Sequence, residues 1–321
     1  MYLIALISTI LAGVLMVLLH KFMIPAFFGN NISLDGKWVM VTGAGRGIGR
    51  EVCVLLCEVS ASLILIDINP DTLERTRQII EKKISERKSS SRSTQKVLTY
   101  TCDVSDFSKI EEVKSSLVDK SVHVDILINN AAIVGEGKEL VKSSLEGIHK
   151  VFKVNTLGPL CVIKAFLPNM IHRDSGRIIN VASAAGRSYA CRLSAYCASK
   201  AGLIQAHHSL RLELRRKGSN VGTSIVMPWH VSDTPMFHGV RHWWPIRVIF
   251  PPLKAKVVAK TIVQLARQEP GRHDVITVPW LLDWFILILH ILPISFKDFA
   301  TELAGGRHGM DTWTAEKKSN T

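Results

Sequence analysis

Residues Val39 to Gly49 read VMVTGAGRGIG, and this stretch decides the fold. Its first half is an apolar, β-branched run that is typical of a buried strand. Three glycines follow in a G-x-x-x-G-x-G spacing, at Gly43, Gly47 and Gly49, and an apolar helical pattern runs from Val52 to Val59. A strand, a glycine turn and a helix N-terminus in this order form a cradle for a pyrophosphate, so we predict a dinucleotide site.

A second motif lies well downstream, in the segment SAAGRSYACRLSAYCASK from Ser183 to Lys200. Tyr196 and Lys200 have the i, i+4 spacing that places two side chains on one face of a helix. A free phenol has a pKa near ~10, and a neighbouring ammonium lowers that pKa by favouring the phenolate. Tyr196 is therefore a candidate proton carrier for an alcohol/carbonyl redox reaction. The hydride that this reaction also needs would come from the predicted dinucleotide.

With both motifs present, the chain resembles the short-chain dehydrogenase/reductase family, and the resemblance extends from Gly36 to Val278. It is most similar to the membrane-bound retinol dehydrogenase/retinal reductase branch. The resemblance implies an α/β fold with a doubly wound parallel sheet of the Rossmann type. The residues that match the family's order and approximate spacing are Thr42, Gly43, Gly47, Gly49, Asn129, Asn130, Ala131, Ala132, Asn155, Ser183, Tyr196 and Lys200.

The resemblance also implies a catalytic group of four residues. Ser183 and Tyr196 would hydrogen-bond to the substrate oxygen, and Tyr196 would exchange the proton. Lys200 would lower the pKa of the tyrosine and hold the nicotinamide ribose. Asn155 would maintain a water relay beside the lysine.

Cofactor contacts are expected along the first strands and in the catalytic segment. Asp67 follows the apolar run Ser62–Ile66, where a carboxylate accepts hydrogen bonds from the adenosine ribose and repels a 2′-phosphate. Arg46, inside the glycine turn, would attract that phosphate. We favour NAD because Asp67 would lie closest to the discriminating atom, with NADP as the alternative. The expected cofactor-binding residues are Thr42, Gly43, Arg46, Gly47, Ile48, Gly49, Asp67, Asp103, Asn129, Ala131, Tyr196, Lys200 and Val231.

The segment Pro228–Thr234, PWHVSDT, departs from the family pattern P-G-x-V-x-T. Trp229 replaces the glycine, and the threonine is displaced by one residue, so the usual carboxamide contacts of this loop are in question. An aromatic and apolar cluster follows from Met236 to Phe250. Packing beneath a lid and a wall for a long lipophilic substrate are both open interpretations. The expected substrate contacts are Ser183, Tyr196, Trp229, Met236 and Phe237.

Residues 1–28 are expected to form a membrane anchor. Met1 to Leu19 carries no charged side chain, and a further apolar run continues to Phe28. This length suits a transmembrane helix. A cleaved signal peptide is the alternative, but the apolar core is long, no basic region precedes it and no A-x-A site follows it. Residues 29–35 would be a linker to a dehydrogenase domain over 36–278.

Two basic residues, Lys21 and Lys37, flank the predicted anchor on its C-terminal side. The positive-inside rule then puts the enzyme domain in the cytosol. Asn31-Ile32-Ser33 is a glycosylation sequon, which a cytosolic domain would leave unused. We expect the membrane of the endoplasmic reticulum or of a lipid droplet, with membrane lipid as a partner.

Residues 279–321 form an expected C-terminal extension. The segment Trp280–Phe296, WLLDWFILILHILPISF, is strongly apolar but is interrupted by an aspartate, a histidine and a proline. It is short for a membrane span, so we expect an interfacial or re-entrant helix, with a core helix or an oligomer contact as the alternatives. The polar tail contains GMDTW, which resembles the tail of the retinal reductase branch.

Bulk properties agree with one large α/β domain plus attachments, since the chain has 321 residues of which 47% are apolar. The net charge is +13, which suits nucleic acid, an anionic membrane surface or a phosphate-bearing cofactor. No nucleic-acid motif is visible, and the apolar N-terminus favours the membrane. The six cysteines form no C-x-x-C pair and the histidines no metal constellation, so we expect reduced thiols and no metal.

These observations predict a membrane-bound enzyme that interconverts a lipophilic alcohol and its carbonyl, with retinol/retinal as the substrate suggested by the resemblance. A hydroxysteroid dehydrogenase or a 3-keto lipid reductase is the rival within enzymes. A catalytically idle membrane scaffold or lipid-binding protein is the rival from another class, and the complete catalytic group argues against it. The family pairs long helices between subunits, so a homodimer is also expected.

Overall fold

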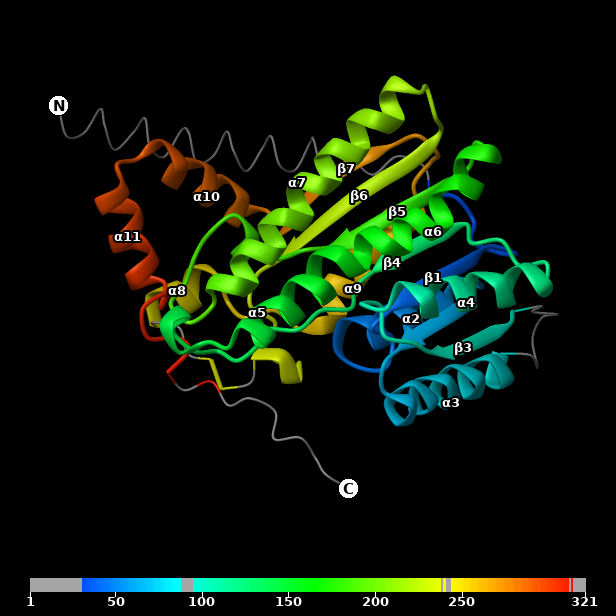
Figure 1. Ribbon diagram of the computed structural model, residues 1–321, viewed down its shortest axis with the longest axis horizontal. Helices are drawn as coiled ribbons and strands as arrows, with labels where there is room; N and C mark the ends of the chain where they lie inside the picture. Colours follow the sequence, from blue (N-terminus) through cyan, green and yellow to red (C-terminus); the bar gives the residue numbers. More distant parts are fainter. Residues whose placement is uncertain (1–30, 88–94, 238, 241–243, 312, 314–321) are drawn as a thin grey trace.

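The computed structural model describes residues 31–87, 95–237, 239–240, 244–311 and 313. The predicted anchor at residues 1–28 lies outside the described residues. So do the start of the predicted linker and the polar tail beyond Trp313. The described chain follows the predicted order of strands and helices (Figure 1).

A seven-stranded parallel sheet forms the centre of the domain, in the order β3-β2-β1-β4-β5-β6-β7. The chain therefore moves outward from β1 in one direction and then returns to its other side through β4, which confirms the predicted doubly wound sheet. The strands are β1 (Trp38–Thr42), β2 (Ser62–Asp67), β3 (Val97–Thr101), β4 (Ile126–Asn129), β5 (Gly176–Val181), β6 (Val221–Pro228) and β7 (His273–Val278).

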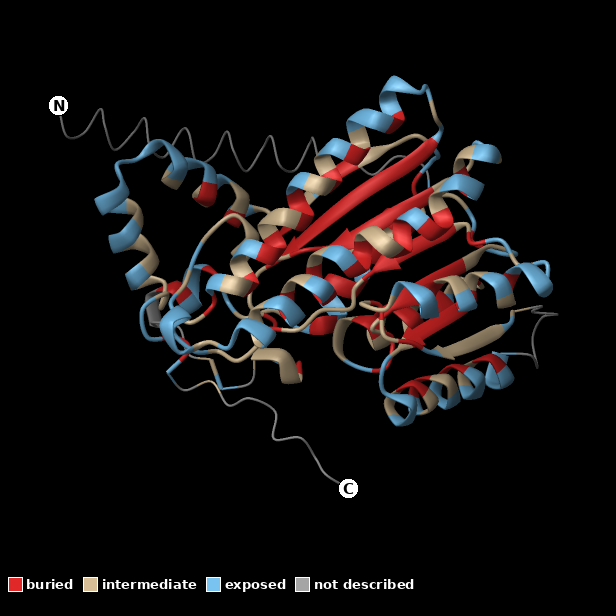
Figure 2. Cartoon of the chain, viewed as in Figure 1, coloured by how far each residue is buried: buried red, intermediate tan, exposed pale blue. Residues whose placement is uncertain are grey.

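The strands are apolar on both faces because helices cover both (Figure 2). Alternate residues of β1 show this directly: Val39 and Val41 pack on one side, and Met40 packs on the other. The first side is covered by α2 (Gly47–Glu58), α3 (Pro70–Arg87) and α9 (Ala255–Ala266). The second is covered by α4 (Phe107–Asp119), α6 (Gly158–His172) and α7 (Ser194–Arg216).

The helical run before α6 is interrupted by a π-helical turn. It runs through η1 (Leu140–Lys142) and α5 (Leu145–Phe152) into a π-helical turn at Lys153–Leu157. The whole helical run Leu145–His172 is long and apolar enough to cross a membrane by length and composition. Half of its apolar window is buried inside the domain, where α6 packs against α4, so in this fold it acts as a core helix.

The C-terminal extension differs from the single interfacial helix that we expected. The apolar segment forms two helices, α10 (Leu281–Ile291) and α11 (Ile294–Leu303), because Pro293 lacks an N–H and stands where the second helix begins. Leu282 and Ile286 of α10 are buried against the loop after β6. Part of this segment is therefore core, as one of the alternatives proposed. Before it come η4 (Pro235–Phe237) and α8 (Trp244–Ile249).

Candidate active site

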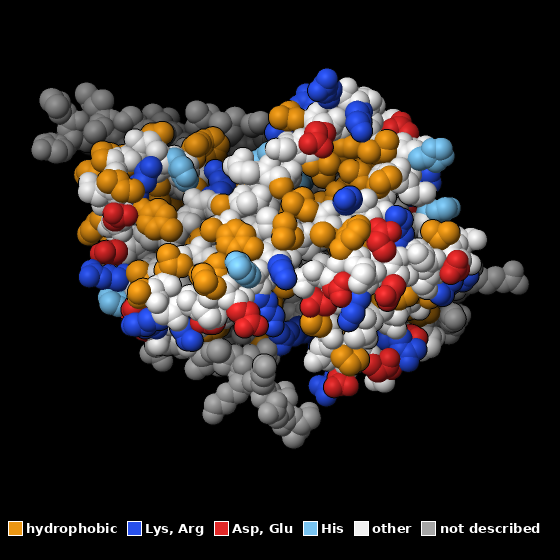
Figure 3. All heavy atoms as spheres, viewed as in Figure 1, with side chains coloured by type: hydrophobic (Ala, Val, Ile, Leu, Met, Phe, Trp, Pro, Cys, Tyr) orange, Lys and Arg blue, Asp and Glu red, His pale blue; other side chains and the backbone are white. Residues whose placement is uncertain are grey.

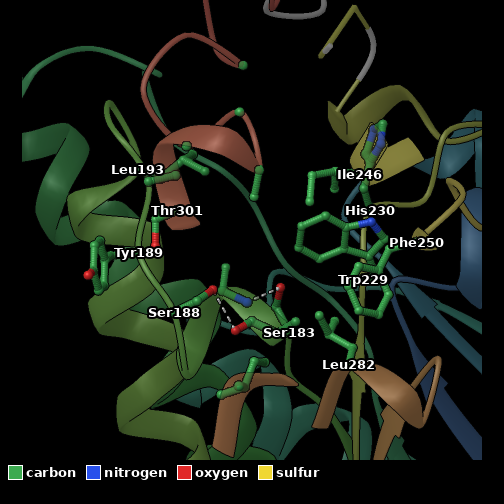
Figure 4. Close-up of a pocket in the computed structure, with 18 of the residues that line it drawn as sticks. Ser183, Ser188, Tyr189, Leu193, Trp229, His230, Ile246, Phe250, Leu282 and Thr301 are labelled. Carbon is green, nitrogen blue, oxygen red and sulfur yellow. Dashed lines mark hydrogen bonds between the residues drawn. The ribbon is translucent and has the colours of Figure 1, made fainter. Parts of the chain in front are cut away.

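Ser183 stands just beyond the carboxyl end of β5, the side on which open parallel sheets bind their ligands. It caps the 3-10 turn η3 (Ala184–Gly186). Its hydroxyl oxygen accepts a hydrogen bond from the Ala185 N–H at 3.1 Å. This contact holds the Ser183 side chain in the wall of a cavity, where Figure 4 shows it.

Tyr196 and Lys200 reach the same place from the first turns of α7, and only 3% and 2% of their surface is exposed. The Lys200 side-chain Nζ donates a hydrogen bond to the Val181 carbonyl at 3.0 Å. Gly186 allows η3 to approach α7 closely, because a Cβ there would lie 2.9 Å from the Lys200 carbonyl carbon. The predicted i, i+4 pair and Ser183 are thus brought together.

The protonation of this group differs from our expectation. Burial raises the pKa of Tyr196 to about 12, although the hydrogen bond from Ser183 lowers it. Burial also lowers the pKa of Lys200 to about 7. The expected lowering of the tyrosine pKa by Lys200 is not found, because the buried lysine is itself close to neutral and its Nζ is directed to Val181. At neutral pH Tyr196 therefore keeps its proton and can donate it.

Asn155 lies in the π-helical turn and is fully buried. Its side chain accepts a hydrogen bond from the Ile133 N–H and donates one to the Ile133 carbonyl, both at 2.8 Å. It also donates to the Ser199 hydroxyl at 3.0 Å, and Ser199 in turn donates to the Tyr196 carbonyl at 2.7 Å. Asn155 thereby connects the segment after β4 to the catalytic turn of α7. Its predicted water relay stays a prediction.

The glycine turn has the geometry of a phosphate cradle. Gly43 and Gly47 have φ values of +66° and +54°, in the left-handed region that favours glycine. A Cβ on Gly49 would collide with the Gly43 carbonyl, and one on Gly43 would lie 2.9 Å from the Cα of Ala131. Side chains at Gly43 and Gly49 would therefore prevent the turn from packing closely against the end of β4 and the start of α2. The unpaired N–H groups at the start of α2 suit a pyrophosphate.

Asp67 lies beside this turn at the end of β2. One carboxylate oxygen accepts a hydrogen bond from the Gly45 N–H at 2.7 Å, and the other accepts one from the Asn69 N–H at 3.0 Å. The carboxylate is thus fixed where a bound ribose would present its hydroxyls. Arg46 is exposed at the residue that precedes α2. Both residues are therefore near the predicted adenosine end of the cofactor site.

Asn130 has a role that the sequence analysis did not assign. Its side chain donates hydrogen bonds to the carbonyls of Thr42 and Gly43, at 3.0 and 3.1 Å. The Thr42 hydroxyl accepts from the N–H groups of Asn130 and Ala131, at 3.0 and 3.1 Å. These four contacts tie the glycine turn to the end of β4. The signal was present in the matched Asn129–Ala132 run, where alternate side chains point to opposite faces.

Asn129 and Asp103 are among the predicted cofactor residues that do not line the space beside the catalytic group. The Asn129 side chain is buried and donates to the Asn180 side chain at 2.9 Å, which is a structural contact. Asp103, beyond the end of β3, accepts hydrogen bonds from the Ser105 N–H at 2.9 Å and the Ser105 hydroxyl at 2.8 Å. Its predicted place beside the adenine stays a prediction.

A hollow of about 460 Å³ including its mouth, here called the inner cleft, extends from Ile48 of the glycine turn to the catalytic group. It is lined by all five predicted substrate contacts and, of the predicted cofactor residues, by Ile48, Tyr196, Lys200 and Val231. Thr234 also lines it, and its methyl group would lie 3.2 Å from a Cβ on Gly47. The displaced threonine thus still reaches the cleft. The residues lining it are Ile48, Asn130, Ala132, Val181, Ala182, Ser183, Tyr196, Lys200, Pro228, Trp229, Val231, Thr234, Met236 and Phe237.

A second hollow, here called the apolar cavity, opens on the other side of Ser183 and measures about 1020 Å³ including its mouth. Figure 4 shows Trp229, Ile246 and Phe250 on one wall and Tyr189 and Leu193 on the opposite wall. α10 and α11 complete the enclosure. The two hollows share Ser183, Pro228, Trp229 and Phe237. A molecule in the apolar cavity would therefore meet the catalytic group at its inner end.

Comparison with known proteins fits this geometry. The sequence model of the short chain dehydrogenase family matches residues 37–244. The chain belongs to the short-chain dehydrogenase/reductase family. It is an NAD(P)-dependent oxidoreductase that acts on alcohol groups and their carbonyls, and the glycine cradle and the inner cleft provide room for such a cofactor. Among the residues that the structure describes, no three His, Cys, Asp or Glu side chains are grouped to hold a metal ion.

Several relatives of this dehydrogenase carry retinoid names. It is 32% identical over 304 residues to retinol dehydrogenase 10-B of Danio rerio, covering 90% of this chain and 88% of the relative. It is also 32% identical over 287 residues to epidermal retinol dehydrogenase 2 of Homo sapiens, covering 89% and 88%. These identities confirm the predicted resemblance to the retinol dehydrogenase branch.

Solved structures share the fold. A metagenomic short-chain oxidoreductase in complex with NADP is 25% identical with a TM-score of 0.61, covering 76% of this chain and 98% of that one. Carveol dehydrogenase from Mycobacterium avium in complex with NAD is 21% identical with a TM-score of 0.64, covering 79% and 100%. The dehydrogenase core thus accounts for about three quarters of the chain, and the rest is additional.

Proposed function

We propose that this enzyme interconverts a lipophilic primary alcohol and its aldehyde, with retinol and retinal as the leading pair. The observation that carries the proposal is the junction of the inner cleft with the apolar cavity at Ser183 and Trp229. A long apolar substrate would fill the cavity by losing its contact with water, while its single oxygen would reach the hydrogen-bonding group. The retinol dehydrogenase names of the relatives support the same class of substrate.

The proposed mechanism uses four residues, and the nicotinamide supplies or accepts the hydride when bound. Ser183 and Tyr196 hydrogen-bond to the substrate oxygen and fix its position. In reduction, the protonated Tyr196 phenol donates its proton to the carbonyl oxygen as charge develops there. Lys200 would contact the nicotinamide ribose, and Asn155 would keep the proton path to solvent. In oxidation, Tyr196 takes the hydroxyl proton back.

NAD is the proposed cofactor. Asp67 is held by hydrogen bonds from Gly45 and Asn69, so its charge cannot easily move away from a 2′-phosphate. Arg46 is exposed on the same side and would favour NADP instead. The fixed carboxylate supports the first choice because its charge is already oriented toward the expected ribose.

Membrane association is part of the proposal. Residues 1–28 would anchor the chain, residues 36–278 would form the cytosolic enzyme domain, and residues 279–321 would extend it at the membrane of the endoplasmic reticulum or a lipid droplet. Apolar side chains gather at the end of the molecule that holds α10 and α11 (Figure 3). The exposed ones on α8, α10 and α11 are Val248, Ile249, Leu281, Trp284, Leu287, Ile288, Ile291, Ile294, Phe296 and Phe299. Other residues of the same three helices line the apolar cavity, so a substrate could enter from lipid. A homodimer through the long helices stays a prediction.

Turnover by the full-length protein in microsomes tests the proposal. All-trans-retinol and all-trans-retinal are assayed with NAD(H) and NADP(H), beside a hydroxysteroid and a 3-keto lipid. We expect retinoid turnover, and a loss of roughly 10²- to 10⁴-fold in Tyr196→Phe with cofactor binding retained. Turnover of the steroid or keto lipid alone would replace the proposed substrate. Full activity in Tyr196→Phe would reject the mechanism, and cofactor binding without turnover of any compound would indicate an idle scaffold.

A further inference from the structure

The chain after α11 folds back over the catalytic segment. Residues 305–311 and 313, here called the C-terminal strap, contact the loop between η3 and α7. The Cys191 N–H donates to the Gly306 carbonyl at 2.8 Å. The Arg192 guanidinium lies 3.4 Å from the Met310 carbonyl oxygen and pairs with the Asp311 carboxylate at 3.2 Å. The strap is thus fixed to the catalytic segment through three points.

The far end of the strap is fixed to a different element. The Trp313 indole N–H donates to the Met236 carbonyl at 3.1 Å, and Met236 belongs to η4. The indole ring also lies against Gly137, where an added Cβ would collide with it. Trp313 therefore joins the strap to the loop after β6 and to the loop after β4. These segments all border the catalytic group.

The backbone of Arg192 gives a second, independent observation. Its φ is +64°, and a left-handed conformation costs a residue other than glycine roughly 1–2 kcal/mol. Strain of this kind persists where the surroundings impose it, and it gathers at functional sites. Here it accompanies a guanidinium that contacts both the carbonyl of Met310 and the side chain of Asp311. The exposed ion pair alone would contribute little, so the strained residue indicates a positioned strap.

The strap places the side chain of Met310 in the wall of the apolar cavity. It is 4% exposed and packs in one apolar cluster with Val134, Leu193 and Tyr196. It also lines the apolar cavity, together with Leu193. Met310 is therefore a wall residue of the cavity that belongs to the same apolar cluster as Tyr196.

We propose that Met310 is a specificity-determining residue, which limits the space beside the carbinol carbon and so favours primary over secondary alcohols. The inference rests on the proposed function in that the substrate is a lipophilic alcohol. A primary alcohol carries one carbon on the reacting centre, and a secondary alcohol carries a second substituent that needs room on that side. Met310 occupies room in the cavity wall, in the cluster that also holds Tyr196, and the strap keeps it there.

The expected size of the effect follows from the volume removed. Each methylene that can be buried contributes about 0.8 kcal/mol, which corresponds to roughly fourfold in kcat/KM. Met310→Ala removes three non-hydrogen atoms, so a substituent of one to three carbons could enter the freed space. We expect the kcat/KM ratio of a secondary to a primary straight-chain alcohol of equal carbon number to rise by roughly 4- to 60-fold. Trp313→Phe, which removes the indole donor, should shift the ratio in the same direction by less.

The test uses the full-length protein and isomeric pairs, 1-dodecanol against 2-dodecanol and 3-dodecanol. Arg307→Ala is the matched control, because Arg307 belongs to the same strap, is exposed and does not line the cavity. Binding is measured separately, as the shift in unfolding temperature that each alcohol causes. A rise of the ratio in Met310→Ala, with the control at the wild-type ratio, supports the inference.

Two results would overturn the inference. In one, Met310→Ala changes kcat/KM for the primary and the secondary alcohols by the same factor. In the other, Met310→Ala changes neither the turnover nor the binding of these alcohols. If the wild type binds the isomers but turns over none, the proposed function fails, and the Met310 effect is then decided by the binding ratio. If the wild type neither binds nor turns over any alcohol, both proposals are rejected.

Discussion

Lys200→Met should make the protein more stable at pH 6 while abolishing turnover. The wild-type lysine has a pKa lowered by burial from 10.5 to about 7, so the folded state disfavours its charge. At 1.36 kcal/mol per pKa unit, the cost of keeping Lys200 protonated below pH 7 is on the order of 5 kcal/mol. Replacing the lysine removes this cost, but loss of its hydrogen bond to the Val181 carbonyl offsets about 1 kcal/mol of the stabilisation. A net stabilisation of roughly 3–4 kcal/mol remains, and methionine preserves the apolar stem.

The sign of the pH dependence makes this prediction specific. Between pH 7 and pH 10.5 the unfolded wild type binds a proton that the folded state does not, so its free energy of unfolding rises with pH. The variant lacks this rise, and its advantage should shrink to nothing or reverse by pH 10. Unfolding temperatures of both proteins are measured at pH 6, 7, 8, 9 and 10, and we expect a gap of roughly 10 °C at pH 6. A gap that stays constant over this range, or a less stable variant at pH 6, would refute the reasoning.

Two further predictions concern the cofactor and the membrane. Asp67→Asn should lower the preference for NAD over NADP, measured as the ratio of kcat/KM values, by roughly 10- to 100-fold. Two unit charges at ~4 Å repel each other by about 4 kcal/mol at an effective dielectric constant of 20, and the partial exposure of Asp67 reduces that repulsion. An unchanged ratio in Asp67→Asn would contradict the prediction. The same change of the ratio in Asp71→Asn would also contradict it. Ile291→Glu, on the exposed face of α10, should raise the KM for a lipophilic alcohol presented in vesicles by about tenfold. An equal rise in Val118→Glu, which places the same charge on an exposed valine of α4, would exclude a local membrane contact.

The redox half of the site could be predicted because its signals are local in sequence. The glycine turn follows directly from a strand, and Tyr196 and Lys200 are one helical turn apart. Parallel strands also bring Ser183 to the correct edge of the sheet, since their carboxyl ends share one side. What the sequence could not supply was the electrostatic balance. The pKa values of Tyr196 and Lys200 depend on complete burial, which is a property of the packed domain.

The substrate half was only partly predictable. Trp229, Met236 and Phe237 were identified as candidates, and all three line the inner cleft. Their partners in the wall come from distant segments, because α10, α11 and the strap return to η3 and α7 from the end of the chain. A hydropathy pattern describes the segment after Trp280 as apolar but cannot tell whether its partner is lipid or protein. In the structure it has both a buried face at Leu282 and an exposed face.

The catalytic group and the substrate wall are held in place by different contacts. The catalytic group is held by contacts within the core, such as Lys200 to Val181 and Asn155 to Ile133. The wall at Met310 is held by the strap, whose hydrogen bonds join it to Cys191, Arg192 and Met236. Substitutions that change the strap's contacts can therefore alter which alcohol fits while the hydrogen bonds that hold Lys200 and Asn155 stay in place. Selectivity that moved only together with the pKa of Tyr196 would show that the two halves are coupled after all.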